Sequence, residues 1–262
     1  MPITAKTHLI GLIGWPVGHS HSPAMHNAAA AALGIDWAYV PLPTRPEALV
    51  AGLAGLAALG FRGVNVTVPH KAAVLPYLDA VYPVAEAIGA ANTLVVSDGK
   101  LIGFNTDWSG FLSDIESHGV ALGGRDCLVL GAGGGARAVV YALLRAGGRV
   151  SVLSRRPEQA GQLVAAVAEA LPGSPLWAGM LDEVVEAAGA AVEPVIVNTT
   201  PLGMAGGTYA GLSPWPEGAP LPGGAFVYDL VYNPSVTPLL RQAGDAGLRY
   251  ANGLGMLVNR AA

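Results

Sequence analysis

Lys71 and Asp107 are the residues whose types and positions best suit proton transfer. The chain contains three lysines, and Lys71 comes just after an apolar, strand-like segment, residues 63–68. We expect a helix to begin at Lys71, where the helix dipole would disfavour the protonated amine and make it a better proton donor. Asp107 precedes another predicted helix, so it either caps that helix, accepts a hydrogen bond from a substrate hydroxyl or pairs with Lys71. A lysine and a carboxylate beside a hydroxyl can move the proton that accompanies hydride transfer; a solvated first-turn lysine is the simpler alternative.

Further polar side chains lie at the ends of predicted strands, where an α/β sheet binds its ligands. Ser20 and Ser22, in the sequence HSHSP, can present hydroxyls to a carboxylate or a polyol, although Ser22 can equally serve only as a helix N-cap. Asn65 and Thr67 share one strand face because side chains alternate along a strand. Asn92 follows in the sequence AANT. With Lys71 and Asp107, these residues make up the candidate polar site of the first half of the chain.

A glycine-rich turn organises the second half. In residues 126–141 (DCLVLGAGGGARAVVY), an apolar strand runs into the turn and a segment with helical periodicity follows. Gly131 and Gly133 hold the first two positions of a G-x-G-x-x-G/A pattern, and Ala136 holds the third. Glycines at such a turn let the backbone approach a pyrophosphate at the positive end of the helix. The pattern predicts a dinucleotide site, although glycine-rich turns also occur as plain connectors.

The residues after the next predicted strand, 149–153, indicate which dinucleotide is bound. NAD-binding proteins place an Asp or Glu here for the ribose 2′-hydroxyl, but this sequence has Ser154, Arg155 and Arg156. Arginine forms paired, charge-assisted hydrogen bonds to phosphate oxygens. The sequence therefore favours NADP, with two solvated arginines ahead of a helix as the alternative.

Short strands and helices alternate along the whole chain, which predicts an α/β protein. Residues 93–97 and 100–104 are expected to form a hairpin across Asp98-Gly99, a favoured tight-turn pair. A helix over 108–118 would lead into the nucleotide-binding half. The Gly- and Pro-rich segment 201–224 is expected to be a mobile loop.

The composition of the 262-residue chain argues against several classes of protein. Hydrophobic residues make up 52 % and charged residues 12 %, but no run of about 18 apolar residues predicts a membrane helix. The single cysteine, Cys127, lies in a predicted buried strand and excludes a disulfide framework. Without a signal-peptide pattern, these features predict a cytoplasmic protein.

The charge distribution points to a small, anionic ligand rather than to a polymer. A net charge of −4 gives no general attraction to nucleic acid or to an anionic membrane. Six of the fourteen Lys and Arg residues nevertheless fall between Arg125 and Arg156, around the predicted phosphate site. The histidines lack a shared ligand cluster, so we expect no metal.

Eight motifs occur in the order seen in shikimate dehydrogenases, and they span nearly the whole chain: HSHSP, NVTVPHK, GAANT, GFNTDWSG, GAGGGARA, NTTPLGM, YDLVYNPSVTPLL and NGLGML. The sequence thus resembles the shikimate dehydrogenase family. The resemblance implies two α/β domains, an N-terminal substrate-binding and catalytic domain and a C-terminal Rossmann-type NADP-binding domain. It also implies the reversible reduction of 3-dehydroshikimate to shikimate with NADPH, a step of chorismate and aromatic amino-acid biosynthesis.

The matching motifs imply a role for each candidate residue. Lys71 and Asp107 would be the catalytic pair. The substrate would contact Ser20, Ser22, Asn65, Thr67, Lys71, Asn92, Asp107, Tyr232 and Arg260. The phosphate turn would comprise Gly131, Ala132, Gly133, Gly134, Gly135 and Ala136, and the 2′-phosphate clamp Ser154, Arg155 and Arg156. The rest of the cofactor would be lined by Asn198, Thr199, Thr200, Met204, Val231, Gly253 and Met256.

The sequence departs from the family pattern at three places. The clamp usually reads Asn-Arg-Thr followed by a further arginine, and here Gln159 holds the later position. Arg260 replaces a substrate-contacting glutamine; arginine is longer, charged and without an acceptor, so it either hinders the usual substrate geometry or adds an anionic contact. The family pattern also continues past residue 262 through a helix that packs on the N-terminal domain. Together these departures predict weaker NADP preference and reduced activity or stability.

The sequence therefore favours an NADP-dependent shikimate dehydrogenase that acts as a monomer or homodimer. The expected division is a substrate-binding domain over residues 1–107 plus 240–262 and an NADP-binding domain over 108–239. One alternative is a quinate/shikimate dehydrogenase that uses NAD, against which the two arginines argue. The other is a non-catalytic shikimate- or nucleotide-binding regulator, against which the Lys71 and Asp107 pair argues.

Overall fold

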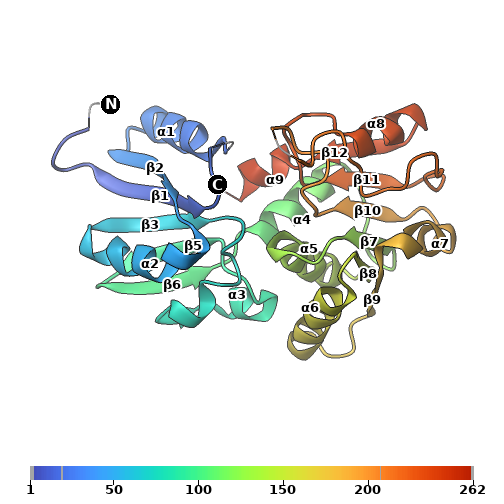
Figure 1. Cartoon of the computed structure of the whole chain (residues 1–262), viewed down its shortest axis with the longest axis horizontal. Helices are drawn as coiled ribbons and strands as arrows, with labels where there is room; N and C mark the ends of the chain where they lie inside the picture. The colour runs from blue at the N-terminus through green and yellow to red at the C-terminus, as the bar shows by residue number, and fades with distance from the viewer. Residues whose placement is uncertain (1–2, 19, 207, 261–262) are drawn as a thin grey trace. The chain divides into compact units, whose positions relative to one another are not determined.

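The chain folds into two compact units that meet in sequence between Thr106 and Asp107. The computed structural model describes residues 3–18, 20–206 and 208–260. Figure 1 shows the first unit in blue to green and the second in green to red, each with its own sheet and its own helices. The predicted α/β fold of two domains is confirmed.

A mixed six-stranded sheet forms the framework of the first unit, with the strand order β2-β1-β3-β5-β6-β4. Its first three strands in sequence pair in parallel, whereas β5 runs antiparallel to both of its neighbours. In chain order the elements are β1 (His8–Gly14), α1 (Ser22–Leu33), β2 (Trp37–Pro43), α2 (Leu49–Ala58), β3 (Phe61–Val66), β4 (Ala80–Val81), α3 (Pro83–Ile88), β5 (Thr93–Ser97) and β6 (Lys100–Phe104).

Side-chain alternation in β3 separates the core of the first unit from its polar residues. Val64 and Val66 are buried in the hydrophobic cluster that α2 covers. Leu49, Leu53 and Leu56 of α2 contribute to the same cluster from one helix face. Asn65 lies between the two valines and is therefore turned toward the opposite side of the sheet.

The predicted hairpin over residues 93–104 is confirmed. Strands β5 and β6 pair from Thr93 with Phe104 to Ser97 with Lys100. Asp98 and Gly99 both have positive φ, 51° and 75°, as a type I′ turn requires.

The predicted helix at Lys71 is wrong. Residues 71–74 form turns, and only a short 3₁₀ helix, Leu75–Tyr77, follows. Two features prevent an α-helix. Pro76 has no amide hydrogen and restricts the residue before it, and the carbonyl of Lys71 accepts the amide of Ala91 (2.8 Å) from a distant segment. The helix-dipole argument for Lys71 therefore does not hold.

A six-stranded parallel sheet forms the framework of the second unit, with the order β12-β11-β10-β7-β8-β9. Counted from β7, this is the strand order 3-2-1-4-5-6 of a dinucleotide-binding fold, whose switch point lies between β7 and β10. The elements are α4 (Asp107–Ser117), β7 (Asp126–Leu130), α5 (Gly134–Arg145), β8 (Arg149–Ser154), α6 (Pro157–Ala170), β9 (Leu176–Met180), α7 (Val184–Gly189), β10 (Val195–Asn198), β11 (Phe226–Asp229), α8 (Pro238–Asp245), β12 (Arg249–Asn252) and α9 (Leu254–Asn259).

Helices cover both faces of the second sheet. Cys127 and Val129 of β7 face a core that also contains residues of α4, α5, α6 and α9. Leu128 and Leu130 face the other core, shared with α7 and α8. Because successive residues of β7 enter different cores, the strand reads as a continuous apolar run in the sequence. Within the described part of the chain, no helix combines the length and apolar character needed to span a membrane.

The last segment of the chain belongs to the second unit, whereas the sequence led us to expect residues 240–262 in the first. Strand β12 pairs with β11 at the edge of the second sheet, and α9 packs on α4. The segment 201–224 contains no helix or strand among its described residues, but Trp215 is 2 % exposed in the core beside α7 and α8. This tryptophan attaches the middle of the segment to that core.

Candidate functional site

Four polar side chains of the first unit form one hydrogen-bonded group, here called the amide cluster: Asn65, Asn92, Thr93 and Thr106. Oδ1 of Asn92 accepts the amide of Thr106 (2.9 Å) and the hydroxyl of Thr93 (3.0 Å). Nδ2 of Asn65 donates to Oγ1 of Thr93 (3.2 Å). The cluster thus joins the end of β3 to the segments that flank the β5–β6 hairpin.

Two further residues expected near the substrate, Thr67 and Lys71, follow the end of β3. Lys71 is 8 % exposed, and its carbonyl is bonded to Ala91, the residue before Asn92. Thr67 follows β3 and donates its amide to Ile13 (2.8 Å). The structure therefore brings Asn65, Lys71 and Asn92 into one region of the first unit.

Ser22 is not the helix N-cap that one interpretation of the sequence suggested. His21 holds the N-cap position of α1 and makes no capping side-chain bond, so Ser22 is the first helical residue and Pro23 the second. Ser22 is 2 % exposed, and its amide donates to Oγ of Ser20 (3.2 Å). The two serines are thus adjacent at the start of α1; His19 of the same motif lies outside the described residues.

Tyr39, which no sequence pattern singled out, supports the amide cluster. Its hydroxyl donates to Oδ1 of Asn65 (2.9 Å), and its ring stacks on His26 at 4.5 Å between centroids. Tyr39 lies on β2, two strands away from β3 in the sheet, with nothing in the local sequence to distinguish it from a core aromatic. Asn65 and Tyr39 are brought together by the sheet order β2-β1-β3.

The glycine turn of the second unit has the geometry expected of a phosphate site. Gly131 has φ of 109°, and a Cβ there would lie 2.7 Å from Oγ1 of Thr199. Gly133 is the N-cap of α5, is exposed, and would have no atom within 4 Å of an added Cβ. Ala136 is fully buried, where its small side chain lets the helix pack closely on the sheet. Open space therefore faces the unsatisfied amides at the first turn of α5.

The proposed clamp follows β8 at the same edge of the sheet. Ser154 ends β8 and is 6 % exposed, and its hydroxyl accepts the amide of Arg156 (3.2 Å). Arg155 and Arg156 are both exposed. A hollow of about 260 Å³ lies beside Arg155, lined also by Leu181, Asp182, Ser213, Pro214, Trp215 and Pro216. The two guanidiniums are accessible to a phosphate group.

Asn198, at the end of β10, uses its side chain inside the protein. It is fully buried, its Nδ2 donates to Asp229 (2.9 Å) and to the carbonyl of Leu202 (3.3 Å), and its Oδ1 accepts the amide and hydroxyl of Thr200. Thr199 donates its hydroxyl to the carbonyl of Leu130 (2.8 Å). These bonds shape the loop after β10 beside the glycine turn.

Other residues predicted to line the cofactor lie on the loops and helices near the same sheet edge. Val231 follows β11, and its amide donates to Oδ1 of Asp229 (2.9 Å). Gly253 must be glycine because an added Cβ would collide with the carbonyl oxygen of Leu230. Met256, in α9, is buried in the core that α4 and α5 share. Met204 and Tyr232 are partly buried.

Asp107 and Arg260 form a partly buried ion pair in the second unit. Asp107, the first residue of α4, is fully buried, and its Oδ1 accepts a hydrogen bond from Nη1 of Arg260 (2.9 Å). An added Cβ at Gly110 would lie 2.9 Å from both the backbone nitrogen and Cβ of Arg260. The close packing of α4 on α9 thus places the guanidinium against the carboxylate.

Arg137, in the first turns of α5, is a further cation near the glycine turn, and no role was predicted for it. Burial lowers the pKa of its guanidinium. A partly buried cation next to a helix N-terminus suits an anionic ligand. The motif GAGGGARA contains this arginine, so its position was visible in the sequence.

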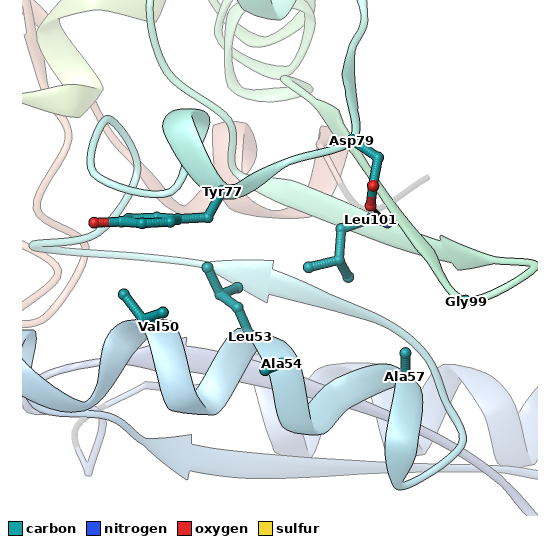
Figure 2. Close-up of a pocket in the computed structure, with 8 residues that line it drawn as sticks. All are labelled: Val50, Leu53, Ala54, Ala57, Tyr77, Asp79, Gly99 and Leu101. Carbon is teal, nitrogen blue, oxygen red and sulfur yellow. Dashed lines mark hydrogen bonds between the residues drawn. The ribbon is translucent and has the colours of Figure 1, made fainter.

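A separate hollow of about 300 Å³ in the first unit contains none of the predicted site residues. It lies between α2 and the 3₁₀ helix that precedes β4, and Figure 2 shows Val50, Leu53 and Tyr77 around it. Ala54, Ala57, Asp79, Gly99 and Leu101 complete its lining. Within the described residues, no three His, Cys, Asp or Glu side chains are grouped closely enough to hold a metal ion.

Comparison with known proteins identifies the family. The model of the shikimate dehydrogenase substrate binding domain matches residues 12–94. A shikimate dehydrogenase (NADP(+)) of Citrifermentans bemidjiense is 52 % identical over 259 residues, covering 98 % of this chain and 88 % of that protein. The chain belongs to the shikimate dehydrogenase family.

Solved structures agree with this membership. Shikimate 5-dehydrogenase from Thermus thermophilus, in complex with NADP(H) and shikimate, has a TM-score of 0.83 and 39 % identity, covering 98 % of this chain and 91 % of that one. Quinate dehydrogenase from Corynebacterium glutamicum, in complex with NAD, has a TM-score of 0.85 and 32 % identity, covering 97 % and 91 %. The family resemblance in the sequence is confirmed over the whole chain.

Proposed function

We propose that this chain is an NADP-dependent shikimate dehydrogenase, which reversibly reduces 3-dehydroshikimate to shikimate in the biosynthesis of chorismate and the aromatic amino acids. The observation that carries the proposal is the 52 % identity, over nearly the full chain, to a shikimate dehydrogenase (NADP(+)). The open glycine turn and the two exposed arginines at the adjacent strand end support it independently.

The second unit offers a fitting site for NADP. The amides at the first turn of α5 would hold the pyrophosphate, with open space at Gly133 for its approach. Arg155 and Arg156 would hold the 2′-phosphate beside Ser154. Thr199, Thr200, Met204, Val231 and Gly253 would line the remainder, with Asn198 and Met256 behind them. When bound, the cofactor supplies or accepts the hydride.

The first unit would bind the other reactant. Ser20 and Ser22 would hold the substrate carboxylate through their adjacent hydroxyls. Asn65, Thr67 and Asn92 would hold the ring hydroxyls, and the amide cluster keeps two of these side chains oriented. Tyr232 of the second unit would add a further contact. A ligand rich in hydroxyls suits a site built from amides and hydroxyls, since each ligand group can find a hydrogen-bond partner.

Lys71 and Asp107 would handle the proton. In the direction of reduction, Lys71 would donate a proton to the carbonyl oxygen, and Asp107 would accept a hydrogen bond from the neighbouring substrate hydroxyl. Nη1 of Arg260 donates to Oδ1 of Asp107 (2.9 Å), which helps to orient the carboxyl group.

Membership of this family also bears on the cell compartment and the oligomeric state. We propose a cytoplasmic monomer or homodimer that binds small molecules and neither nucleic acid nor membrane. Burial raises the pKa of the Cys127 thiol to about 12, so this cysteine remains protonated and serves as core rather than as a nucleophile.

Reduction of NADP or NAD by shikimate or quinate, followed at 340 nm, tests the proposal. We expect activity with shikimate and NADP and little with the other pairs. Quinate-dependent reduction of NAD, the reaction suggested by the likeness to quinate dehydrogenase, would replace the proposal with that alternative. If the folded protein reduces the cofactor with no pair of substrate and cofactor, the non-catalytic regulator would be favoured.

The clamp is tested in the same assay with the double variant Arg155→Gln/Arg156→Gln. Loss of charge-assisted bonds to the 2′-phosphate should lower kcat/KM for NADP by about 10- to 100-fold and leave kcat/KM for NAD unchanged. Arg62→Gln, at an exposed position of the first unit, is the matched control. An equal loss with both cofactors would contradict the clamp.

A further inference from the structure

Asp229 stands at the end of β11 as a fully buried carboxylate with three donors. Its Oδ1 accepts Nδ2 of Asn198 (2.9 Å) and the amide of Val231 (2.9 Å), and its Oδ2 accepts the hydroxyl of Thr237 (2.6 Å). A carboxylate accepts hydrogen bonds and donates none, so it matches this set of donors. Replacement by a group with a donor must break at least one of the three bonds.

Each donor belongs to a different part of the sheet edge. Asn198 ends β10 and shapes the loop that follows it, through bonds to Thr200 and Leu202. Val231 opens the loop after β11. Thr237 is the N-cap of α8, where its hydroxyl accepts the amide of Leu240 (3.3 Å). One side chain therefore fixes the loops after β10 and β11 and the start of α8 relative to one another.

Direct contacts extend this arrangement to the glycine turn and between the loops. Thr199 follows Asn198 and donates its hydroxyl to the carbonyl of Leu130, and its Oγ1 lies 2.7 Å from the position that a Cβ on Gly131 would take. The amide of Ala205 donates to the carbonyl of Asn233 (2.9 Å), which joins the two loops a second time. A shift of Asp229 would be transmitted to both loops.

We infer that Asp229 is a positioning residue for the cofactor site, acting with Asn198 and Thr237 to hold the loops that carry Thr199, Met204 and Val231. The inference rests on the proposed function, because these loop residues are the ones assigned to NADP. Asp229 is itself fully buried, so its action on a ligand passes through the loops. Thr237 takes part by presenting its hydroxyl to the carboxylate.

Two substitutions remove the same bond from opposite sides. Asp229→Asn retains an acceptor for Asn198 and Val231 but turns a donor toward Thr237. Thr237→Val removes the hydroxyl at nearly constant shape, and Thr237→Ser restores it. Asp126→Asn is the control: Asp126 begins β7, and its partner is Arg149 in an exposed pair.

The experiment combines amide hydrogen exchange with binding of NADPH followed by its fluorescence. In Asp229→Asn and Thr237→Val, amides of residues 199–205 and 230–237 should exchange faster, and the Kd for NADPH should rise about tenfold, the order of effect expected when contact residues are misplaced. Thr237→Ser and Asp126→Asn should match the unaltered protein in both measurements. The KM for shikimate should change less than the KM for NADP.

Unchanged exchange in both loops, with Kd within twofold, would overturn the inference. Faster exchange with an unchanged Kd would overturn the positioning role and leave Asp229 with a purely structural one. Failure of the unaltered protein to bind NADPH would refute the proposed function instead, and the exchange data would still decide whether Asp229 holds the loops. If Asp229→Asn fails to fold, Thr237→Val carries the same test.

Discussion

At the scale of single residues, the pairing of Asp107 with Arg260 adds a structural role to the aspartate of the motif GFNTDWSG. Asp107 is fully buried and the Arg260 side chain is 22 % exposed. Loss of Arg260 would remove a donor from a carboxyl group that has little access to water, which costs more than loss of an exposed pair. A residue that departs from the family pattern is thereby tied to the aspartate assigned to catalysis.

Replacement of Arg260 by methionine should therefore destabilise the protein. We expect a loss of about 1.5–3 kcal/mol in the free energy of unfolding, measured by chemical denaturation. Arg260→Gln should lose less, because its amide can still donate to Asp107. Arg149→Met removes an exposed partner of Asp126 and should cost far less; equal losses for Arg260→Met and Arg149→Met would contradict the argument.

Asp229 predicts a specific dependence of stability on pH. Burial raises the pKa of Asp229 from 3.8 to about 6, against the opposing effect of its hydrogen bonds. Between these values the folded protein holds a proton that the unfolded chain has released, so this group makes the protein more stable as pH falls through 6. On the linkage relation the gain is about 1.4 kcal/mol between pH 7.5 and pH 5. Asp229→Asn has no carboxyl group to titrate at this position. Its free energy of unfolding, relative to that of the unaltered protein, should therefore fall by that amount as the pH is lowered from 7.5 to 5. A difference that stays constant with pH would contradict this prediction.

At the scale of elements, the N-terminus of α5 shows how the choice of residue controls the access of a ligand to the helix amides. Gly133 has φ of −84°, which any residue adopts, and open space around its missing Cβ. Glycine here is therefore required neither by backbone strain nor by packing within the protein. The approach of a ligand to the amides of the helix explains why Gly133 has no side chain.

Gly133→Ala should accordingly separate binding from stability. We expect only a small fall in the melting temperature, because exchange of a glycine N-cap for alanine costs about 1 kcal/mol or less. The Kd for NADPH should rise about tenfold, since the methyl group would occupy the space of the phosphate. Gly161→Ala, in α6, also has open space and should leave NADPH binding unchanged. Unaltered binding by Gly133→Ala would remove the pyrophosphate from this turn.

Elements with a local signature were predictable from the sequence, and those shaped by distant partners were not. The strand, turn and helix of residues 126–145 and the Asp98-Gly99 hairpin follow from periodicity and turn chemistry. The predicted helix at Lys71 was wrong because Pro76 and a bond to Ala91 outweigh the local pattern.

Long-range pairs account for the unpredicted part of the site. Asp107 meets Arg260 across 153 residues, and Asn198 meets Asp229 across 31. Neither separation reflects the period of a helix or a strand, so no sequence pattern indicates these contacts. The packing of α4 on α9 and the parallel pairing of β10 with β11 bring the partners together. Family resemblance supplied the candidate residues, but not the contacts that orient them.

At the scale of the whole molecule, each unit has a hydrophobic core of its own. The clusters around α2 and β3 contain residues of the first unit, and those around β7 and β10 contain residues of the second. Units with separate cores can be stabilised separately, since a ligand raises the free energy of unfolding of the part it binds.

The two ligands should therefore leave different patterns of protection. NADP alone should slow amide exchange mainly at residues 131–137, 154–157 and 198–204, and shikimate alone mainly at 65–71 and 91–93. Exchange would be measured by mass spectrometry with each ligand at about 100 times its Kd. At that concentration, binding stabilises the unit that holds the ligand by about 2.7 kcal/mol. The Arg155→Gln/Arg156→Gln variant is the matched control, because it should lose the NADP pattern and retain the shikimate pattern. Protection by NADP that is equally strong around Asn65 and Asn92 would contradict the assignment of one reactant to each unit.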